Sequence, residues 1–293
     1  MRRYRLDLTI RYQFDRPTGA ARQVLRICPA DLPGLQQVRA CTVRVTPAAA
    51  ERQEFTDFFG TRAIGLVLPG GLTDLRFDMT AEVTRAEPER DLDLSGAPSG
   101  LPAVLAAHTG LGPDSPHHFL AASPRIPAVP AIARFAAEAT AGARTTRALV
   151  EMLGQALHAE LRFDAGATEV DTPIATAFAG RHGVCQDFAQ IMIAGLRSLG
   201  VPAAYVSGFL RTLPPPGQPR LQGADAMHAW VRAWTGPRMG WVDYDPTNAC
   251  MVAADHIVIG HGRDYGDAAP VTGSLRLDGH QSGSHSVDLA ELP

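Results

Sequence analysis

The amino-acid sequence predicts an α+β protein, with an all-β region first and a region of helices followed by strands after it. Apolar and polar side chains alternate with a period of two in residues 4–14, which is typical of a strand with one buried face. Apolar side chains recur at helical spacing in residues 149–161 and 188–199. Beyond residue 200 the chain returns to short runs rich in aromatic and β-branched residues. Helices that precede strands in the second half indicate an α+β arrangement.

The first 85 or so residues are expected to form strands. The alternation of residues 4–14 recurs at 41–45 and 75–83, and the turn sequences ADLPG and PGG separate the runs. One polar and one apolar face is typical of an antiparallel sheet that covers a core on one side. We therefore expect an N-terminal β-sandwich domain over residues 1–88.

The middle of the chain is expected to connect two domains. Residues 89–130 are rich in Pro, Gly, Ala and Ser and show no period, which predicts a connecting segment with one short helix near 101–108. The two amphipathic helices at 149–161 and 188–199 open the second domain, and Gly200 with Pro202 ends the later one.

Strands are expected to complete the second domain, which we assign to residues 131–293. Short strands are predicted at 201–210, 227–234 and 240–244, separated by Pro and Gly loops. Alternation at 275–277 and 287–289 predicts late strands that finish this domain.

Composition excludes several classes of protein. Apolar residues make up 45% and charged residues 19% of the 293 residues, as in soluble globular proteins. A net charge of -3 gives no electrostatic footprint for nucleic acid or an anionic membrane surface, and no run approaches the 18 or so apolar residues of a membrane span. Arg5, Asp7 and Arg11 interrupt the stretch that a signal peptide would need to keep uncharged. Four cysteines are too few for a disulfide framework, so we expect a cytoplasmic protein.

All 27 basic residues are arginine. Schiff-base chemistry, a P-loop and a lysine general base each need a lysine amine, so the sequence excludes these mechanisms.

Cys185 is the cysteine best suited to chemistry, because it begins the later predicted helix. The positive end of a helix and its unpaired N–H groups favour a thiolate and can donate to an oxyanion. A lone cysteine is more often a small hydrophobic core residue, so position alone leaves both interpretations open.

A thiol nucleophile needs a base, and the base needs an acceptor that orients it. His228 on a predicted strand is the candidate base, although a histidine among apolar residues is often only a core residue. Asp245 is the candidate orienting group, although an Asp before Pro also starts turns. Asp243 is the second candidate for this role. Together Cys185, His228 and Asp245 describe a Cys-His-Asp triad.

Several motifs in order along the chain resemble the bacterial transglutaminase-like superfamily. They are GVCQDFA at 183–189, GVPAAYVSGFL at 200–210, HAW at 228–230, GW with DPTN at 240–248, and GRDY at 262–265. The β region, with its DFFG turn at 57–60, looks like the β domain that precedes this core in many bacterial members. The resemblance implies a papain-like α+β core in which Cys185 is the nucleophile, His228 the general base and acid, and Asp245 the orienting group.

The resemblance also implies the reaction. The Cys185 thiolate would attack a carboxamide or peptide carbonyl, backbone N–H groups near Cys185 would hold the oxyanion, and His228 would protonate the leaving amine. We expect a peptide or protein amide as substrate, with a glutamine-like acyl donor among the candidates, and hydrolysis before amine transfer because an open thioester meets water. The alternative is a binding or assembly module that keeps the fold without turnover. Gln190, where histidine is common, and Met227, where a small polar residue is common, bear on substrate preference.

The sequence gives no reason to expect a cofactor or a metal. The later histidines lack the spacing of an HExxH helix or of a Cys/His zinc set; they are His256, His261, His280 and His285. His117 and His118 are expected in an exposed loop, Cys28 and Cys41 in the core of the β domain, and Cys250 in a structural role.

Overall fold

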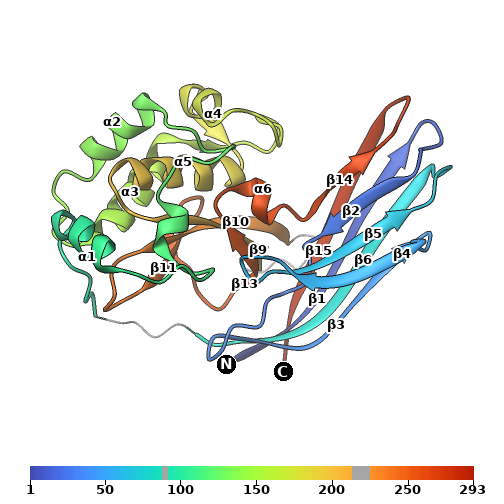
Figure 1. The fold of residues 1–293 in the computed structure, drawn as a ribbon, viewed down its shortest axis with the longest axis horizontal. Helices are drawn as coiled ribbons and strands as arrows, with labels where there is room; N and C mark the ends of the chain where they lie inside the picture. The colour runs from blue at the N-terminus through green and yellow to red at the C-terminus, as the bar shows by residue number, and fades with distance from the viewer. Residues whose placement is uncertain (88–91, 213–224) are drawn as a thin grey trace, which may run out of the picture.

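The computed structural model describes residues 1–87, 92–212 and 225–293. It confirms the predicted α+β class: a β-sandwich lies beside a layer of helices packed on a third sheet (Figure 1). The predicted boundary between residues 88 and 89 lies outside the described residues.

The sandwich begins with six strands, three of which lie where the alternation at 4–14, 41–45 and 75–83 predicts them. They are β1 (Arg2–Phe14), β2 (Ala21–Leu25), β3 (Gln36–Thr46), β4 (Glu51–Thr56), β5 (Arg62–Leu68) and β6 (Asp74–Arg85). Along β1 the apolar residues Tyr4, Leu6 and Leu8 are at most 2% exposed, whereas Arg5 between them is exposed and Asp7 is half-buried. Leu25 and Ile64 from the second sheet join the same hydrophobic core, so the two sheets pack face to face.

The tail of the chain corrects one expectation. Its two strands exist, as β14 (Val271–Leu275) and β15 (Gln281–Leu292), but they do not finish the second domain. β15 pairs with β1 and β14 with β2, which gives the sheet orders β15-β1-β6-β3 and β14-β2-β5-β4. Val287 and Leu289 lie opposite Leu8 and Leu6 and are fully buried in the sandwich core. Alternation identifies a strand with one buried face but not the sheet that accepts it.

The helical layer contains the three predicted helices and three that were not predicted. The predicted ones are α1 (Leu101–Ala107), α3 (Thr146–Glu160) and α5 (Cys185–Ser198). The others in the described residues are α2 (Pro130–Ala139), α4 (Ile174–Gly180) and α6 (Tyr265–Ala268). His117 and His118 lie in the 3-10 helix η2 (Pro116–Phe119) and are partly buried, not in an exposed loop.

The third sheet lies under the helices and has the order β12-β11-β10-β9-β13, with every pair antiparallel. Its strands are β9 (Ala203–Leu210), β10 (Ala226–Trp234), β11 (Trp241–Asp245), β12 (Cys250–Met251) and β13 (His256–Gly262). Phe188, Ile191 and Met192 of α5 are at most 1% exposed in the core that also holds Ala229 and Val231 of β10. Each such burial stabilises the fold by about 2 kcal/mol, so the N-terminus of α5 is held firmly over β10.

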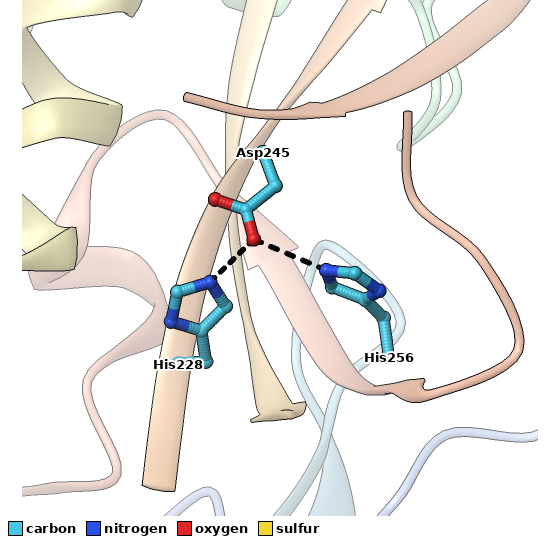
Figure 2. Close-up of side chains that lie close together, drawn as sticks. All are labelled: His228, Asp245 and His256. Carbon is cyan, nitrogen blue, oxygen red and sulfur yellow. Dashed lines mark hydrogen bonds and ion pairs between the residues drawn. The ribbon is translucent and has the colours of Figure 1, made fainter. Parts of the chain in front are cut away.

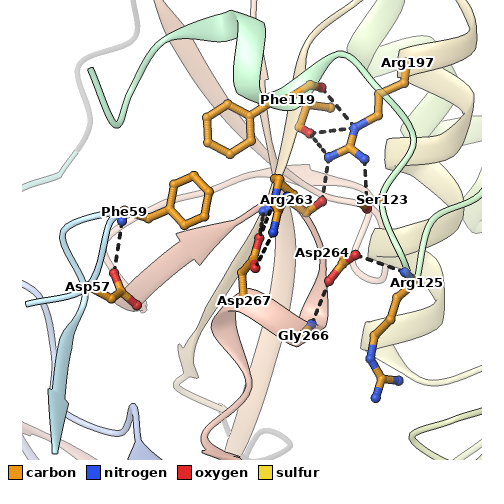
Figure 3. Close-up of polar contacts among 11 residues, drawn as sticks. Asp57, Phe59, Phe119, Ser123, Arg125, Arg197, Arg263, Asp264, Gly266 and Asp267 are labelled. Atoms are coloured by element: carbon orange, nitrogen blue, oxygen red, sulfur yellow. Dashed lines mark hydrogen bonds and ion pairs between the residues drawn. The ribbon is translucent and has the colours of Figure 1, made fainter. Parts of the chain in front are cut away.

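A buried arginine fixes the segments around the helical layer (Figure 3). The Arg197 guanidinium, near the end of α5, donates to the carbonyl oxygens of Phe119, Ala203 and Arg263 at 3.0, 2.9 and 2.5 Å. Burial lowers the pKa of Arg197 to about 10. The side chain thus joins η2, the start of β9 and the loop before α6.

The described ranges 1–87, 92–212 and 225–293 contain no helix that combines the length and the apolar character needed to cross a membrane.

Candidate active site

Cys185 is the first residue of α5, and a side chain of the first helical turn caps the backbone just before it. Asp187 accepts hydrogen bonds at the same carboxylate oxygen from the backbone N–H of Val184, at 2.8 Å, and from the hydroxyl of Thr168, at 2.6 Å. Gly183 leaves room for this cap, because a Cβ there would lie 2.6–2.9 Å from the Asp187 side chain. The first backbone N–H groups of a helix have no acceptor within it, so those of Cys185 and the next residue are free to meet a ligand.

His228 on β10 links Cys185 to Asp245. Its side chain is buried, it hydrogen-bonds to Asp245, and Cys185 lies close enough to raise its pKa. Nε2 lies 2.7 Å from Oδ2 of Asp245 (Figure 2), which leaves Nδ1 as the nitrogen that faces the Cys185 thiol. The structure therefore brings together the three predicted residues, Cys185 from α5, His228 from β10 and Asp245 from β11.

The electrostatics of this trio favour a charged imidazole. Burial would lower the pKa of His228, but the hydrogen bonds to Asp245 and Cys185 and the charges of both groups raise it to about 10. Asp245 is fully buried, which opposes ionisation, yet the hydrogen bonds from His228, His256 and Asn248 hold its pKa well below the usual range.

Asp245 is anchored by both of its oxygens. Oδ1 accepts from the backbone N–H groups of Thr247 and Asn248, at 2.9 and 3.2 Å. Oδ2 accepts from the Asn248 side chain at 2.7 Å, in addition to His228, and lies 3.1 Å from Nε2 of His256. The DPTN turn thus serves as the local part of the anchor.

Asp243 does not orient His228. Its Oδ2 accepts from the indole N–H of Trp230 at 3.3 Å, and its other oxygen lies 3.8 Å from Nε of Arg232. Of the two candidate aspartates, Asp245 is therefore the one that hydrogen-bonds to His228.

His256 is the neighbour that sequence reasoning missed. It begins β13, and its spacing from the other histidines gave no signal. His256 and Asp245 lie on strands that are not neighbours, since β9 and β10 lie between β13 and β11 in the sheet. Their contact depends on the topology of the sheet and has no signal in the local sequence.

The ligand atoms of His228, Asp245 and His256 lie within 4.8 Å of one another, a grouping that could hold a metal ion. Both imidazole nitrogens are at hydrogen-bond distance from one carboxylate oxygen, at 2.7 and 3.1 Å. A metal would replace these hydrogen bonds and occupy Nε2 of His228. The proton of the neutral imidazole would then stay on Nδ1, so His228 could not accept a proton from Cys185.

Two tyrosines and Arg125 are linked to the residue that follows Cys185. The rings of Tyr205 and Tyr265 meet edge to face at 6.0 Å, and the Arg125 guanidinium lies 5.4 Å from the Tyr265 ring centre. Arg125 and Gln186 both donate to the carbonyl oxygen of Val170, at 2.9 and 3.0 Å. Gln186 and the cationic Arg125 thus share one acceptor.

A cavity of about 400 Å³ lies where the DFFG turn of the sandwich meets α6, and Cys185 does not line it. Arg26 pairs with Asp57 at 2.8 Å on one wall, and Arg263 pairs with Asp267 at 2.8 Å on another. Phe59 of the turn packs on Phe119 of η2, with ring centres 5.5 Å apart. The charges of this cavity are therefore balanced within its own walls.

The other singled-out residues lie in supporting positions. Gln190 is 2% exposed in the body of α5. Cys28 is buried and Cys41 partly buried in the sandwich, and Cys250 pairs with Asp245 across β11 and β12. Burial and the charge of Asp245 raise the pKa of Cys250 to about 11. All four cysteines are free thiols.

Comparisons with known proteins identify the family and the fold. The family model of the transglutaminase-like superfamily matches residues 133–246, and that of the bacterial transglutaminase-like N-terminal region matches residues 4–84. The crystal structure named "a Putative Cysteine Protease from Cytophaga hutchinsonii" has a TM-score of 0.79 and 22% identity, covering 100% of this chain and 91% of that one. This likeness shows the fold.

Two curated proteins extend the comparison in sequence. Uncharacterized protein Rv2569c of Mycobacterium tuberculosis (strain ATCC 25618 / H37Rv) is 31% identical over 259 residues, which is 84% of this chain and 79% of that protein. The Protein-glutamine gamma-glutamyltransferase of Pseudomonas aeruginosa is 39% identical over 71 residues, 24% of this chain and 10% of that protein. Family and fold support thiol-based chemistry in general. The chain belongs to the transglutaminase-like superfamily, with a papain-like α+β core and an N-terminal β-sandwich.

Proposed function

We propose that this protein is a cysteine-nucleophile enzyme that acts on amide or peptide bonds through a thioester. One observation carries the proposal: Nε2 of the buried His228 lies 2.7 Å from the Asp245 carboxylate, and the helix-terminal thiol of Cys185 is close enough to act on the same imidazole. A nucleophile, a base and a group that orients the base are the parts that this chemistry needs.

In the first half-reaction, the Cys185 thiolate attacks the carbonyl carbon of the substrate and forms a carbon–sulfur bond. The backbone N–H groups of Cys185 and Gln186 are the donors for the resulting oxyanion. The imidazolium of His228 gives its Nδ1 proton to the leaving nitrogen, the carbon–nitrogen bond breaks, and ammonia or an amine departs.

In the second half-reaction, neutral His228 takes a proton from water or from an incoming amine as it attacks the thioester. The carbon–sulfur bond breaks, and Cys185 leaves as the thiolate beside the imidazolium. The product is a carboxylic acid when water attacks and a new amide when an amine attacks. Asp245 stays ionised throughout and keeps Nε2–H of His228 directed away from the thiol.

We favour hydrolysis of a peptide or protein amide over amine transfer. Cys185 is only partly buried, so water has access to the thioester. The similarity to a glutamyltransferase makes a glutamine side chain a reasonable acyl donor to test.

The test is release of ammonia from a glutamine-containing peptide, with and without monodansylcadaverine as the competing amine. We expect ammonia release by the wild type and none by Cys185→Ala, with more acid than dansylated product. Release that persists in Cys185→Ala would contradict the thioester mechanism. Dansylated product in excess would contradict the preference for water, and a wild type without an activated thiol would favour a binding module.

A further inference from the structure

We propose that His256 is a positioning residue that holds Asp245 in the orientation in which its Oδ2 meets His228, through a proton fixed on Nε2 of His256. This inference rests on the proposed function, because it assigns a role in the same proton-transfer chain. It concerns a residue that touches neither the thiol nor a substrate.

The turn between β12 and β13 fixes which nitrogen of His256 carries the proton. The backbone N–H of Ala253 donates to Nδ1 of His256 at 3.3 Å, so Nδ1 is an acceptor. The backbone N–H of His256 in turn donates to the carbonyl oxygen of Ala253 at 3.1 Å. A neutral imidazole with an accepting Nδ1 has its proton on Nε2, and this nitrogen lies 3.1 Å from Oδ2 of Asp245.

Packing holds the ring of His256 in this position. Its side chain is 5% exposed, and the Trp230 ring meets it nearly at right angles, with centres 5.3 Å apart. The ring of His228 lies 6.1 Å away on another side. A buried ring packed in this way keeps its donor aimed at the carboxylate without a further loss of rotamer entropy.

His256 is the distant anchor of the carboxylate. The other donors that fix Asp245, apart from His228 itself, come from Thr247 and Asn248 in the same turn. Such local donors move together with Asp245 if the turn shifts. His256 belongs to β13, which is separated from β11 by β9 and β10 in the sheet, so its hydrogen bond ties the turn to the rest of the sheet. Displacing a catalytic group by about 1 Å can reduce a rate a hundredfold.

The test compares two substitutions at this position. His256→Gln keeps an N–H donor near Nε2, whereas His256→Met fills similar space without one. The readout is the rate of Cys185 alkylation by iodoacetamide at pH 6, which reports the thiolate–imidazolium pair. Trypsin cuts here only at arginine and leaves each of the four cysteines on its own peptide, so mass spectrometry follows Cys185 alone.

We expect His256→Met to slow alkylation roughly tenfold and His256→Gln to stay within about twofold of the wild type. His261→Gln, on the same strand but not bonded to Asp245, is the matched control and should label like the wild type. Equal rates for His256→Met and the wild type would overturn the proposal. A metal in the cluster would also overturn it, and would be recognised by alkylation that changes on dialysis against EDTA and reverts with added Zn²⁺.

A measurement on the wild type covers the case in which His256→Met fails to fold. Long-range nitrogen–proton NMR of histidine-labelled protein should show a protonated Nε2 and an unprotonated Nδ1 for His256. The opposite tautomer would overturn the proposal. The two proposals can fail separately. Alkylation of Cys185 at the same rate in the wild type and in His228→Ala would contradict the proposed function, whereas the tautomer of His256 tests its contact with Asp245 alone.

Discussion

His228 reaches Asp245 diagonally across two antiparallel strands, with 2.7 Å between its Nε2 and Oδ2 of the carboxylate. Trp230, two residues further along β10, donates to Asp243, two residues earlier on β11. Side chains two apart on a strand face the same side, so the two pairs form parallel diagonals on one face. Each aspartate thus has its own partner, and the two carboxylates are not interchangeable.

This separation predicts different outcomes for two matched substitutions. Asp245→Asn removes the charge that stabilises the imidazolium and should reduce turnover or thiol activation by roughly a hundredfold or more. Asp243→Asn keeps an acceptor for the Trp230 indole and should change the same rates less than about threefold. Alkylation kinetics of Cys185 in both variants provide the comparison. Equal effects would contradict the assignment of Asp245 as the orienting group.

The raised pKa of His228 predicts a pH-dependent stability. In the unfolded chain a histidine titrates near about 6.5, whereas in the folded protein the pKa of His228 is about 10. Between these values the folded state holds a proton that the unfolded state lacks, so stability from this group is complete below about pH 6.5 and is lost as pH rises to about 10.

Urea unfolding of the wild type and of His228→Gln across this range checks the sign. The free energy of unfolding of the wild type should fall relative to that of the variant by about 1.4 kcal/mol for each pH unit between the two pKa values. A difference that stays constant from pH 6 to 10 would mean that His228 is not held as a cation.

The cap of α5 predicts that Gly183 is required for an active thiol. A methyl group at Gly183 would press on the Asp187 carboxylate that holds Val184, so Gly183→Ala should cost about 1–3 kcal/mol and slow alkylation of Cys185. Gly100→Ala is the matched control, since a Cβ there meets no atom within 4 Å. Thermal unfolding with alkylation kinetics tests both, and an undisturbed thiol in Gly183→Ala would show that the cap does not set its position.

The buried guanidinium of Arg197 predicts a large loss of stability when it is removed. Arg197→Leu leaves the three carbonyl oxygens that it serves without this donor, and we expect a loss of about 3 kcal/mol or more in denaturant unfolding. Arg134→Leu, at an exposed position of α2, should change stability by less than about 0.5 kcal/mol. Similar losses in the two variants would refute a structural role for the Arg197 network.

Local patterns were enough to predict the elements that carry the site. Periodicity identified α5 and its start at Cys185, and the run of aromatic and β-branched residues identified β10, because capping and burial act over a few residues. The pairing of β15 with β1 and the contact of His256 with Asp245 escaped prediction for a common reason. Both depend on which strands become neighbours in space, and neither leaves a mark in the residues nearby.

The most direct test of the central claim is the rate of Cys185 alkylation by iodoacetamide between pH 5 and 8, in the wild type and in His228→Ala. A free thiol loses about tenfold in rate for each pH unit below its pKa of about 8.5. A thiolate paired with the His228 imidazolium predicts a nearly constant rate across this range in the wild type and the tenfold decline per unit in the variant. The same decline in both proteins would contradict a thiolate–imidazolium pair.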